Sequence, residues 1–183
     1  MDIIKTHFEG LLVLTPRVYK DHRGYFYESF NEMQLVNAGV HKKFVQDNEA
    51  SSKYGVIRGL HYQLSPAAQA KLVRVVYGEI LDVVVDLRPD SKTFGMHFSL
   101  IMNDINKKQL YIPEGFAHGY SVLSDTAVFA YKCSHFYDPV LEGGIYFQDP
   151  ELNIDWIIPK EEQIMSEKDK SLPLWSKHKK WKQ

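Results

Sequence analysis

The chain of 183 residues contains a single cysteine, Cys133, so it cannot form an internal disulfide. A lone thiol fits a reducing compartment, and we expect a cytoplasmic protein. The formal net charge is only −1, from 22 Lys and Arg against 23 Asp and Glu. This near balance gives no general reason to expect nucleic acid or an acidic membrane surface as a partner.

Long hydrophobic runs are also missing, and none approaches the length of a membrane span. The N-terminal segment MDIIKTHFEGLLVLTP contains acidic residues and no small-residue cleavage pattern, so we expect neither a signal peptide nor a membrane segment. The chain does have 44% apolar and 13% aromatic residues, enough for a globular core. Its length suits one domain that covers residues 1–183.

Apolar and β-branched runs separated by turn residues dominate the middle of the chain. The segment KLVRVVYGEILDVVVDLR (71–88) contains two such runs around Gly78, and glycine at the first central position predicts a type II′ hairpin. The segment GYSVLSDTAVFAYKC (119–133) predicts a second hairpin, which turns at Ser124-Asp125-Thr126. Many short strands with turns between them indicate an all-β sandwich or barrel.

Helical signals are few and short. The segment FNEMQLVNAG (30–39) predicts one or two turns that end at Gly39, and PKEEQIMSEKD (159–169) predicts another short helix near the C-terminus. The final SKHKKWKQ (176–183) is interpreted as a solvated tail. We therefore expect β structure with a few short peripheral helices.

Four polar residues, His61, Lys71, His118 and Tyr131, interrupt runs that otherwise resemble a barrel wall. Burying polar groups without partners is costly, and a ligand pocket inside a barrel removes that cost. A histidine base, a tyrosine acid and a lysine near a developing anion suit proton transfer at carbon. Each residue alone is more often structural, so this hypothesis depends on the combination.

Strict alternation within YGVIRGLHYQ (54–63) places Arg58 and His61 on opposite faces of a strand. It separates Arg23 and Glu28 in the same way. The glycines within these segments, Gly59 and Gly24, are candidate positions for bulges that redirect the side chains.

The histidines also raise the question of a metal. PEGFAH (113–118) matches the second half of the cupin pattern, PxGxxH, and Gly55 and His61 have the spacing that opens the first half. The HxH ligand pair is missing, because Tyr-Gln follows His61, and no carboxylate follows in SPAAQAK (65–71). A catalytic first-row metal normally takes about three protein ligands. We therefore predict cupin architecture with no metal, and a metal-dependent cupin is the alternative.

Six stretches resemble the TDP-4-dehydrorhamnose 3,5-epimerase family, in family order over nearly the whole chain. RGLHYQ together with IPEGFAHG is specific in combination, whereas either motif alone would indicate only a cupin-like protein. The matching stretches are DHRGYFYESF (21–30), FVQDNEASSKYGVIRGLHYQ (44–63), KLVRVVYGEILDVVVDLRPDSKTFG (71–95), LYIPEGFAHGYSVLSDTAVFAYKC (110–133), FYDPVLEGGIYFQDPELNIDW (136–156) and SEKDK (166–170).

The resemblance implies a cupin-type jelly roll without cofactor or metal, in a homodimer whose partner subunit contributes to each site. The substrate it implies is TDP-4-keto-6-deoxyglucose, inverted at C3 and C5 to TDP-4-dehydro-L-rhamnose for TDP-L-rhamnose biosynthesis. Both carbons flank the C4 ketone, so each proton is acidified and each carbanion is an enolate. The alternatives are a single-centre epimerase of a related TDP-keto sugar and a non-catalytic sugar-binding jelly roll.

The resemblance also implies a role for each matched residue. His61 resembles the base, Asp169 its dyad partner, Tyr131 the acid and Lys71 the group that stabilises the C4 oxyanion. The other matched positions are expected to bind substrate. They are the diphosphate-facing Arg23 and Arg58, the thymine-stacking Tyr137, a contact near the sugar oxygens in His118, and Phe26, Glu28, Gln46, Asp47, Asn48, Glu142 and Lys168.

Overall fold

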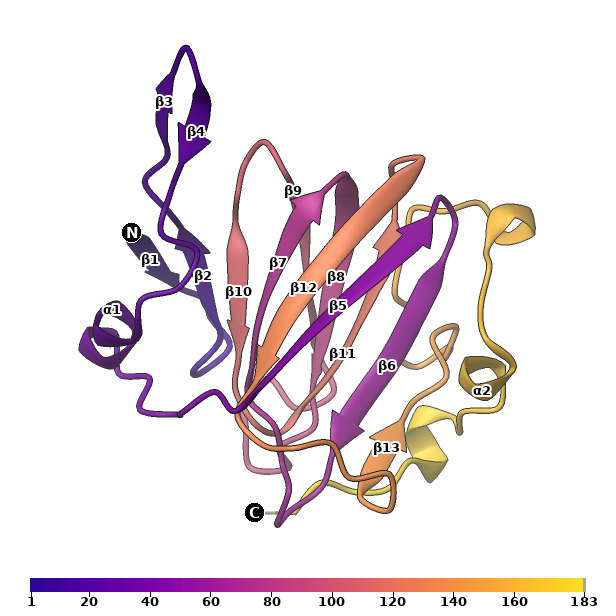
Figure 1. Cartoon of the computed structure of the whole chain (residues 1–183). Coiled ribbons are helices and arrows are strands. Elements are labelled where there is room, and N and C mark those ends of the chain that lie inside the picture. The colour runs from indigo at the N-terminus through magenta and orange to yellow at the C-terminus, as the bar shows by residue number, and fades with distance from the viewer. Residues whose placement is uncertain (183) are drawn as a thin grey trace.

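The computed structural model describes residues 1–182, and two antiparallel sheets face each other in it (Figure 1). In spatial order, the first sheet contains β1 (Asp2–Lys5), β2 (Leu12–Thr15), β10 (Gln109–Ile112), β7 (Lys71–Tyr77), β12 (Thr126–Cys133) and β5 (Gln46–Lys53). The second sheet contains β13 (Glu142–Gly144), β6 (Ile57–Gln63), β11 (Phe116–Val122), β8 (Glu79–Asp86) and β9 (His97–Asn103).

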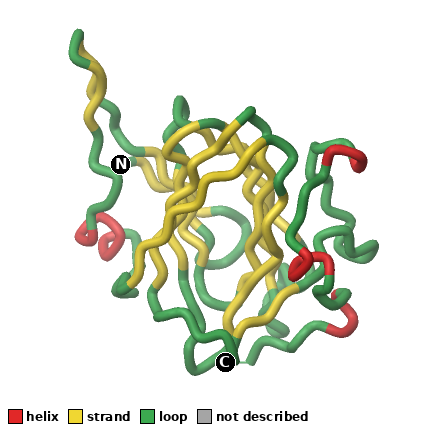
Figure 2. Tube along the Cα trace, turned by 45° about the vertical axis from the view of Figure 1, so that its right-hand side comes forward, coloured by secondary structure: helices red, strands yellow, loops and turns green. Residues whose placement is uncertain are grey.

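The remaining elements are small and peripheral, as Figure 2 shows. The strands β3 (Tyr19–Asp21) and β4 (Gly24–Phe26) pair with each other in a hairpin, here called the arm, which projects from the sheets (Figures 1 and 2). The short helices are α1 (Glu32–Asn37), η1 (Lys160–Glu162), α2 (Glu167–Lys170) and η2 (Trp175–Lys177). Among residues 1–182, no helix is long and apolar enough to cross a membrane.

The core follows from the two-residue period of the strands. On β8, Ile80 and Val84 point between the sheets and pack in one cluster with Phe129 of β12. The alternate residues Leu81 and Val83 face the other side of the second sheet, where later segments cover them. The outer face of the first sheet is partly covered near α1, through residues such as Leu35, Leu72 and Tyr111.

Both predicted hairpins are wrong, because each turn carries the chain from one sheet to the other. β7 pairs with β10 and β12, whereas β8 pairs with β11 and β9. β11 and β12 likewise belong to different sheets. Gly78 has φ +80°, and a Cβ there would lie 2.1 Å from the Thr126 carbonyl oxygen. The turn chemistry was correctly recognised, but apolar residues on both strand faces do not distinguish a hairpin from a corner between stacked sheets.

The C-terminal segment is packed, so the prediction of a solvated tail is wrong for residues 176–182. The side chains of His178 and Trp181 are buried, and Trp181 belongs to the cluster on the outer side of the second sheet. Tyr62 donates a hydrogen bond from its hydroxyl to the carbonyl of Lys179 at 2.5 Å. The many lysines of this segment suggested exposure to solvent. The indole of Trp181, which stands among these lysines, instead packs on the apolar surface of the second sheet.

The helix predictions fared better. The predicted turns at residues 30–39 form α1, which Asn31 caps, and Gly39 follows with φ +91°. The predicted helix at 159–169 is divided into η1 and the start of α2, because Ile164 between them bridges to Val56. Gly24 ends the turn of the arm instead of marking a bulge.

Candidate active site

In Figure 1, β5 at the edge of the first sheet lies next to β6 of the second. Side chains from both strands line a groove there. It consists of two adjoining hollows of about 320 and 250 Å³. Three side chains, His61, Lys71 and Tyr131, line both hollows. The groove therefore brings together the polar residues that interrupt the strand pattern.

A bulge in β6 places Arg58 and His61 on the same groove. In the pairing of β6 with β11, Arg58 faces Tyr120 and His61 faces His118, so β6 has one extra residue in between. Gly59 has φ +112°, and a Cβ there would lie 2.6 Å from the His118 carbonyl oxygen. The candidate bulge at Gly59 is confirmed, and it resolves the conflict with strict alternation.

His61 forms a dyad with Asp169 of α2, with 2.7 Å between Nε2 and Oδ1. Ser166 caps this helix and accepts a hydrogen bond from the Asp169 backbone at 3.1 Å. Burial raises the pKa of Asp169, but the interactions with His61, Gly59 and Ser166 outweigh it and leave that pKa below its usual value. An ionised Asp169 holds the proton of His61 on Nε2, which leaves the Nδ1 lone pair available as a base.

Lys71 and Tyr131 occupy the wall opposite His61, on the neighbouring strands β7 and β12. The Lys71 ammonium lies 5.9 Å from the centre of the Tyr131 ring. Burial lowers the pKa of Lys71, although the neighbouring Cys133, Asp82 and Glu142 act in the opposite direction. Burial also raises the pKa of Tyr131, so its hydroxyl keeps the proton that an acid must donate.

His118 lines the larger hollow and forms a second histidine–aspartate pair. Its Nε2 lies 2.8 Å from Oδ2 of Asp82, a fully buried residue of β8. Sequence reasoning missed Asp82 as a site residue. One feature of the sequence could have indicated its role: Asp82 is an acidic residue within the apolar run 80–85 and is not part of a turn.

Polar residues around the smaller hollow form a connected cluster at one end of the groove. Glu142 of β13 accepts hydrogen bonds from the Tyr137 hydroxyl at 3.0 Å and the Lys168 ammonium at 2.6 Å. Gln46 accepts from the Tyr137 backbone at 3.0 Å. Gln63, which sequence reasoning did not assign to the site, accepts from the Asp138 backbone at 2.9 Å and so helps to fix the same turn. Asn48 also lines this hollow.

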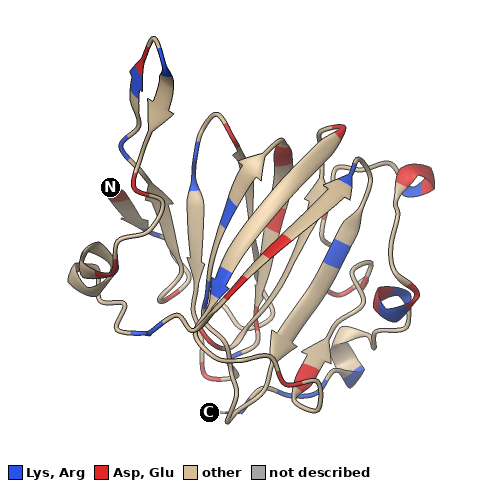
Figure 3. Cartoon of the chain, in the orientation of Figure 1, with Lys and Arg blue, Asp and Glu red and all other residues tan. Residues whose placement is uncertain are grey.

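Three expected binding residues lie on or beside the arm, away from the groove. Arg23 is 80% exposed and pairs with Asp21 at 2.6 Å, in the charged tip visible in Figure 3. Phe26 is 68% exposed. Glu28 accepts hydrogen bonds from side chains at the start of α1. The structure therefore does not bring these residues to the groove of their own chain.

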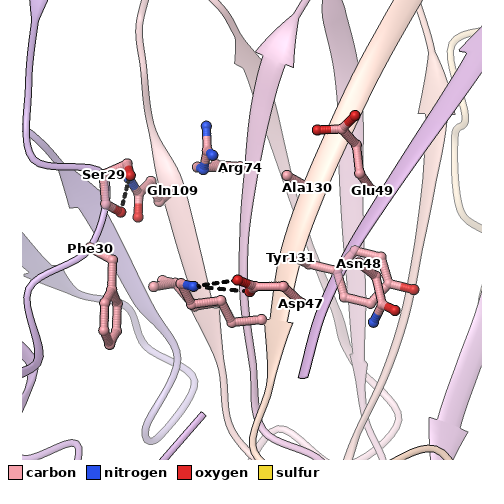
Figure 4. Close-up of a pocket in the computed structure, with 11 residues that line it drawn as sticks. Ser29, Phe30, Asp47, Asn48, Glu49, Arg74, Gln109, Ala130 and Tyr131 are labelled. Atoms are coloured by element: carbon pink, nitrogen blue, oxygen red, sulfur yellow. Dashed lines mark hydrogen bonds and ion pairs between the residues drawn. The ribbon is translucent and has the colours of Figure 1, made fainter. Parts of the chain in front are cut away.

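Asp47 also points away from the groove. It pairs with Lys132 at 2.8 Å on the outer face of the first sheet, where both residues line a separate hollow with Phe30 and Arg74 (Figure 4). Alternation along β5 explains this, because Asp47 stands between two residues, Gln46 and Asn48, that line the groove. Asp47, which was expected to bind substrate, therefore lies on the face of the first sheet that is turned away from the groove.

Comparison with known proteins gives a consistent result. The family model for dTDP-4-dehydrorhamnose 3,5-epimerase matches residues 5–177. The chain belongs to the dTDP-4-dehydrorhamnose 3,5-epimerase family. The enzyme of that name from Shigella flexneri is 49% identical over 92% of this chain and 93% of its own. The enzyme from Methanothermobacter thermautotrophicus is 47% identical over 92% and 91%.

Solved structures of this epimerase family confirm the fold. A Legionella pneumophila epimerase in complex with dTDP-4-keto-L-rhamnose superposes with a TM-score of 0.92, at 45% identity over 96% of this chain and 93% of its own. A 3′-monoepimerase from Streptomyces bikiniensis, in complex with dTDP-quinovose, gives a TM-score of 0.87 at 34% identity over 93% and 86%. The predicted family, the all-β cupin-type fold and the enzyme class, an epimerase, are confirmed.

The metal question can be examined in the geometry of the groove. Among residues 1–182, no three His, Cys, Asp or Glu side chains come together in a way that could hold a metal ion. His61 and His118 face each other across β6 and β11, but each uses Nε2 to bind an aspartate. The groove thus contains two histidine–aspartate pairs, Tyr131 and the ammonium groups of Lys71 and Lys168.

Proposed function

We propose that this protein epimerises TDP-4-keto-6-deoxyglucose at C3 and C5 to give TDP-4-dehydro-L-rhamnose, without a cofactor. The observation that carries the proposal is the position of His61 and Tyr131 on opposite walls of one groove. Inverting a carbon requires a proton to leave one face and another to arrive at the opposite face. The two sheets supply a base and an acid from different sides.

Each inversion follows from the groove residues in two steps. His61 takes the proton from the carbon next to the ketone, and the C–H electron pair forms the enolate double bond while the carbonyl pair moves onto O4. Lys71 stabilises the negative O4 by its charge. Tyr131 then donates a proton to the carbon from the other face, and the carbonyl re-forms. His61 then loses its proton to water and Tyr131 takes one up, and the same sequence at the second carbon completes the product with no change in formula.

The diphosphate and base of the nucleotide are assigned to polar groups around the groove. Arg58 lines the larger hollow and suits phosphate oxygens because its guanidinium is a planar fork of donors. Tyr137 stands at the smaller hollow and offers its ring to thymine, with Gln46, Asn48, Glu142 and Lys168 around it. His118 contacts the sugar oxygens from the floor of the larger hollow.

The test is hydrogen exchange at carbon in deuterated water. The protein is incubated with TDP-4-keto-6-deoxyglucose, with and without a chelator, and the sugar mass is followed by spectrometry. We expect two deuterons, no effect of the chelator, and loss of exchange in His61→Asn, which also controls for spontaneous exchange. Loss of activity with the chelator would favour the metal-dependent alternative, and no exchange above the control would refute the proposed activity.

One deuteron instead of two would indicate a single-centre epimerase. This second candidate is favoured by one observation among the relatives, because a dTDP-4-dehydrorhamnose 3-epimerase from Streptomyces niveus is 38% identical over 88% of this chain. The same base, acid and oxyanion group would serve either reaction. The count of deuterons separates the two candidates directly.

We infer further that two copies form a homodimer in which the arm of one protomer completes the groove of the other. Support comes from the aromatic surface of the arm, where Tyr19, Tyr25 and Phe26 are exposed. Arg23, the second arginine expected at the diphosphate, lies on the arm and not at its own groove. We also propose a cytoplasmic location, since the only cysteine is a free thiol.

A further inference from the structure

Asp82 is a buried carboxylate to which the proposed mechanism gives no role. It lies on β8 between Ile80 and Val84, in the row of side chains that points between the two sheets. The residue has no exposed surface. A carboxylate in such an apolar row costs a large desolvation free energy, so its presence calls for a partner or a function.

The partner of Asp82 is His118, through the 2.8 Å contact between Oδ2 and Nε2. The other oxygen, Oδ1, is buried and has no hydrogen-bond partner among residues 1–182. Asp82 also favours the charged form of Lys71, against the burial that lowers the pKa of that lysine. This carboxylate therefore acts on both groups that lie near the expected position of O4.

Two histidine–aspartate pairs in one groove share the same connectivity but differ in burial. In the His61–Asp169 pair the histidine is 30% exposed, whereas in the His118–Asp82 pair it is 7% exposed and the aspartate is fully buried. Both rings bind their carboxylate through Nε2, so in both Nδ1 is the nitrogen left for the substrate. A lone pair on Nδ1 makes a base, but it would repel an oxyanion.

We propose that Asp82 is a positioning residue for this reaction: as the buried counter-ion of His118, it fixes the ring and holds it as an imidazolium whose Nδ1–H donates to O4. This inference rests on the proposed epimerase function. This imidazolium and Lys71 together set two positive charges against the one negative charge of Asp82. As the enolate forms, the negative charge on O4 balances the excess, which is the preorganised arrangement that favours a developing anion.

The first test compares Asp82→Asn with Asp86→Asn. Asparagine keeps the shape of Asp82 and an oxygen that accepts from His118, but it removes the charge. We expect kcat to fall about 10²-fold, the usual effect of losing one oxyanion donor, while the dissociation constant for TDP stays within about threefold. Asp86 is an equally buried carboxylate on the same strand that binds Arg88, Ser91 and Thr93 outside the groove. Folded Asp86→Asn should keep near wild-type kcat.

The pH profile of Asp82→Asn adds a measurement that a merely structural role would not change. Lys71 is faced by Asp82 from β8, Glu142 from β13, and Cys133 and the Tyr131 ring from β12. Asp82 raises the pKa of Lys71, so removing its charge should lower that pKa. Lys71 then loses its proton at lower pH, and the basic limb of kcat/KM should move to lower pH. A kcat within threefold of wild type, or an unmoved basic limb, would overturn the proposal.

A second test measures the wild-type protein and does not depend on how Asp82→Asn folds. The ring nitrogens of ¹⁵N-labelled histidine are observed at neutral pH with TDP bound, and the His118 signals are assigned by their loss in His118→Gln. We expect both ring nitrogens of His118 to be protonated, whereas His61 keeps one unprotonated nitrogen. An unprotonated Nδ1 in His118 would overturn the proposal. A wild-type protein that exchanges no substrate protons would instead refute the epimerase function, and the spectrum would still report on the Asp82–His118 pair.

Discussion

Burial acts in opposite directions on the ionisable side chains of the groove, and this separates their roles. It lowers the pKa of Lys71 and raises the pKa of Tyr131. It would raise the pKa of Asp169 as well, but the contacts from His61, Gly59 and Ser166 reverse the direction. The result is a neutral phenol that can donate and an ionised carboxylate that can orient a base. One hydrophobic environment therefore prepares an acid and a base on opposite walls.

At the level of single residues, His61→Asn should remove the base and leave the binding surface in place. We expect kcat to fall about 10³-fold, because asparagine cannot accept the carbon proton. The affinity for TDP should change little, since His61 touches the sugar and not the nucleotide. Steady-state kinetics and calorimetric titration with TDP check this. A variant with near-normal turnover would show that another group is the base.

A second prediction at this scale concerns Asp86 and the pH dependence of stability. Burial raises the pKa of Asp86, but hydrogen bonds from Arg88, Ser91 and Thr93 bring it below its usual value. The folded pKa is thus lower than the unfolded one, so the stabilisation is fully present above about pH 4 and is lost as the pH falls through the folded value. Asp86→Asn should lower the free energy of unfolding by about 3 kcal/mol at neutral pH.

Urea unfolding of wild type and Asp86→Asn from pH 7 to pH 3 measures this effect. The difference between the two proteins should stay constant down to about pH 5 and shrink below about pH 4, where the carboxyl of the unfolded chain is protonated while the folded one stays ionised. A difference that is independent of pH would assign the stabilisation to packing instead of charge.

At the level of elements, the base dyad depends on structure outside the paired strands. His61 reaches the groove through the bulge of β6, and Asp169 sits on α2, a helix of four residues. The chain from α2 onward then packs over the outer side of the second sheet through Trp175 and Trp181. The C-terminal segment is therefore structural, in spite of its charge.

Truncating the indole of this segment should destabilise the protein. Trp181 is 7% exposed, so Trp181→Ala should lower the free energy of unfolding by about 3 kcal/mol, in the range found for buried aromatic residues. The matched control is Lys182→Ala, because Lys182 is the exposed neighbour and should change stability by less than about 0.5 kcal/mol. Equal, small effects from both variants would show that this segment is a solvated tail after all.

The same elements show what the sequence could and could not predict. Polar residues within apolar runs, among them Lys71 and Tyr131, predicted a ligand pocket inside a barrel, because such interruptions can be read locally. The sequence could not predict that the turns at Gly78 and at residues 124–126 are corners, since pairing partners are distant in sequence. The role of Asp82 was not predicted, because a single acidic residue in an apolar run matches no motif. Asp169 was found only through the family resemblance, since an acid in a short helix is ordinarily solvated.

At the level of the whole molecule, the groove lies at an open edge of the sandwich. Among residues 1–182, β5 pairs with β12 alone, and the groove is formed where β5 approaches β6. The arm extends away from the sheets (Figure 2), and the Lys107 ammonium lies 3.0 Å from the hydroxyl of Tyr25, in the middle of β4. Within one chain, the arm and the groove therefore lie apart.

Mixing two inactive variants tests whether the arm completes the groove of a second copy. Arg23→Ala carries the defect on the arm, and His61→Asn carries it in the groove. In a two-fold dimer with exchanged arms, a mixed dimer has one site with both defects and one intact site. Random exchange makes half of the dimers mixed, so the mixture should recover about a quarter of wild-type activity per total site. Activity that stays at the level of the separate variants, with subunit exchange shown by mass spectrometry of the dimers, would place Arg23 at the groove of its own chain.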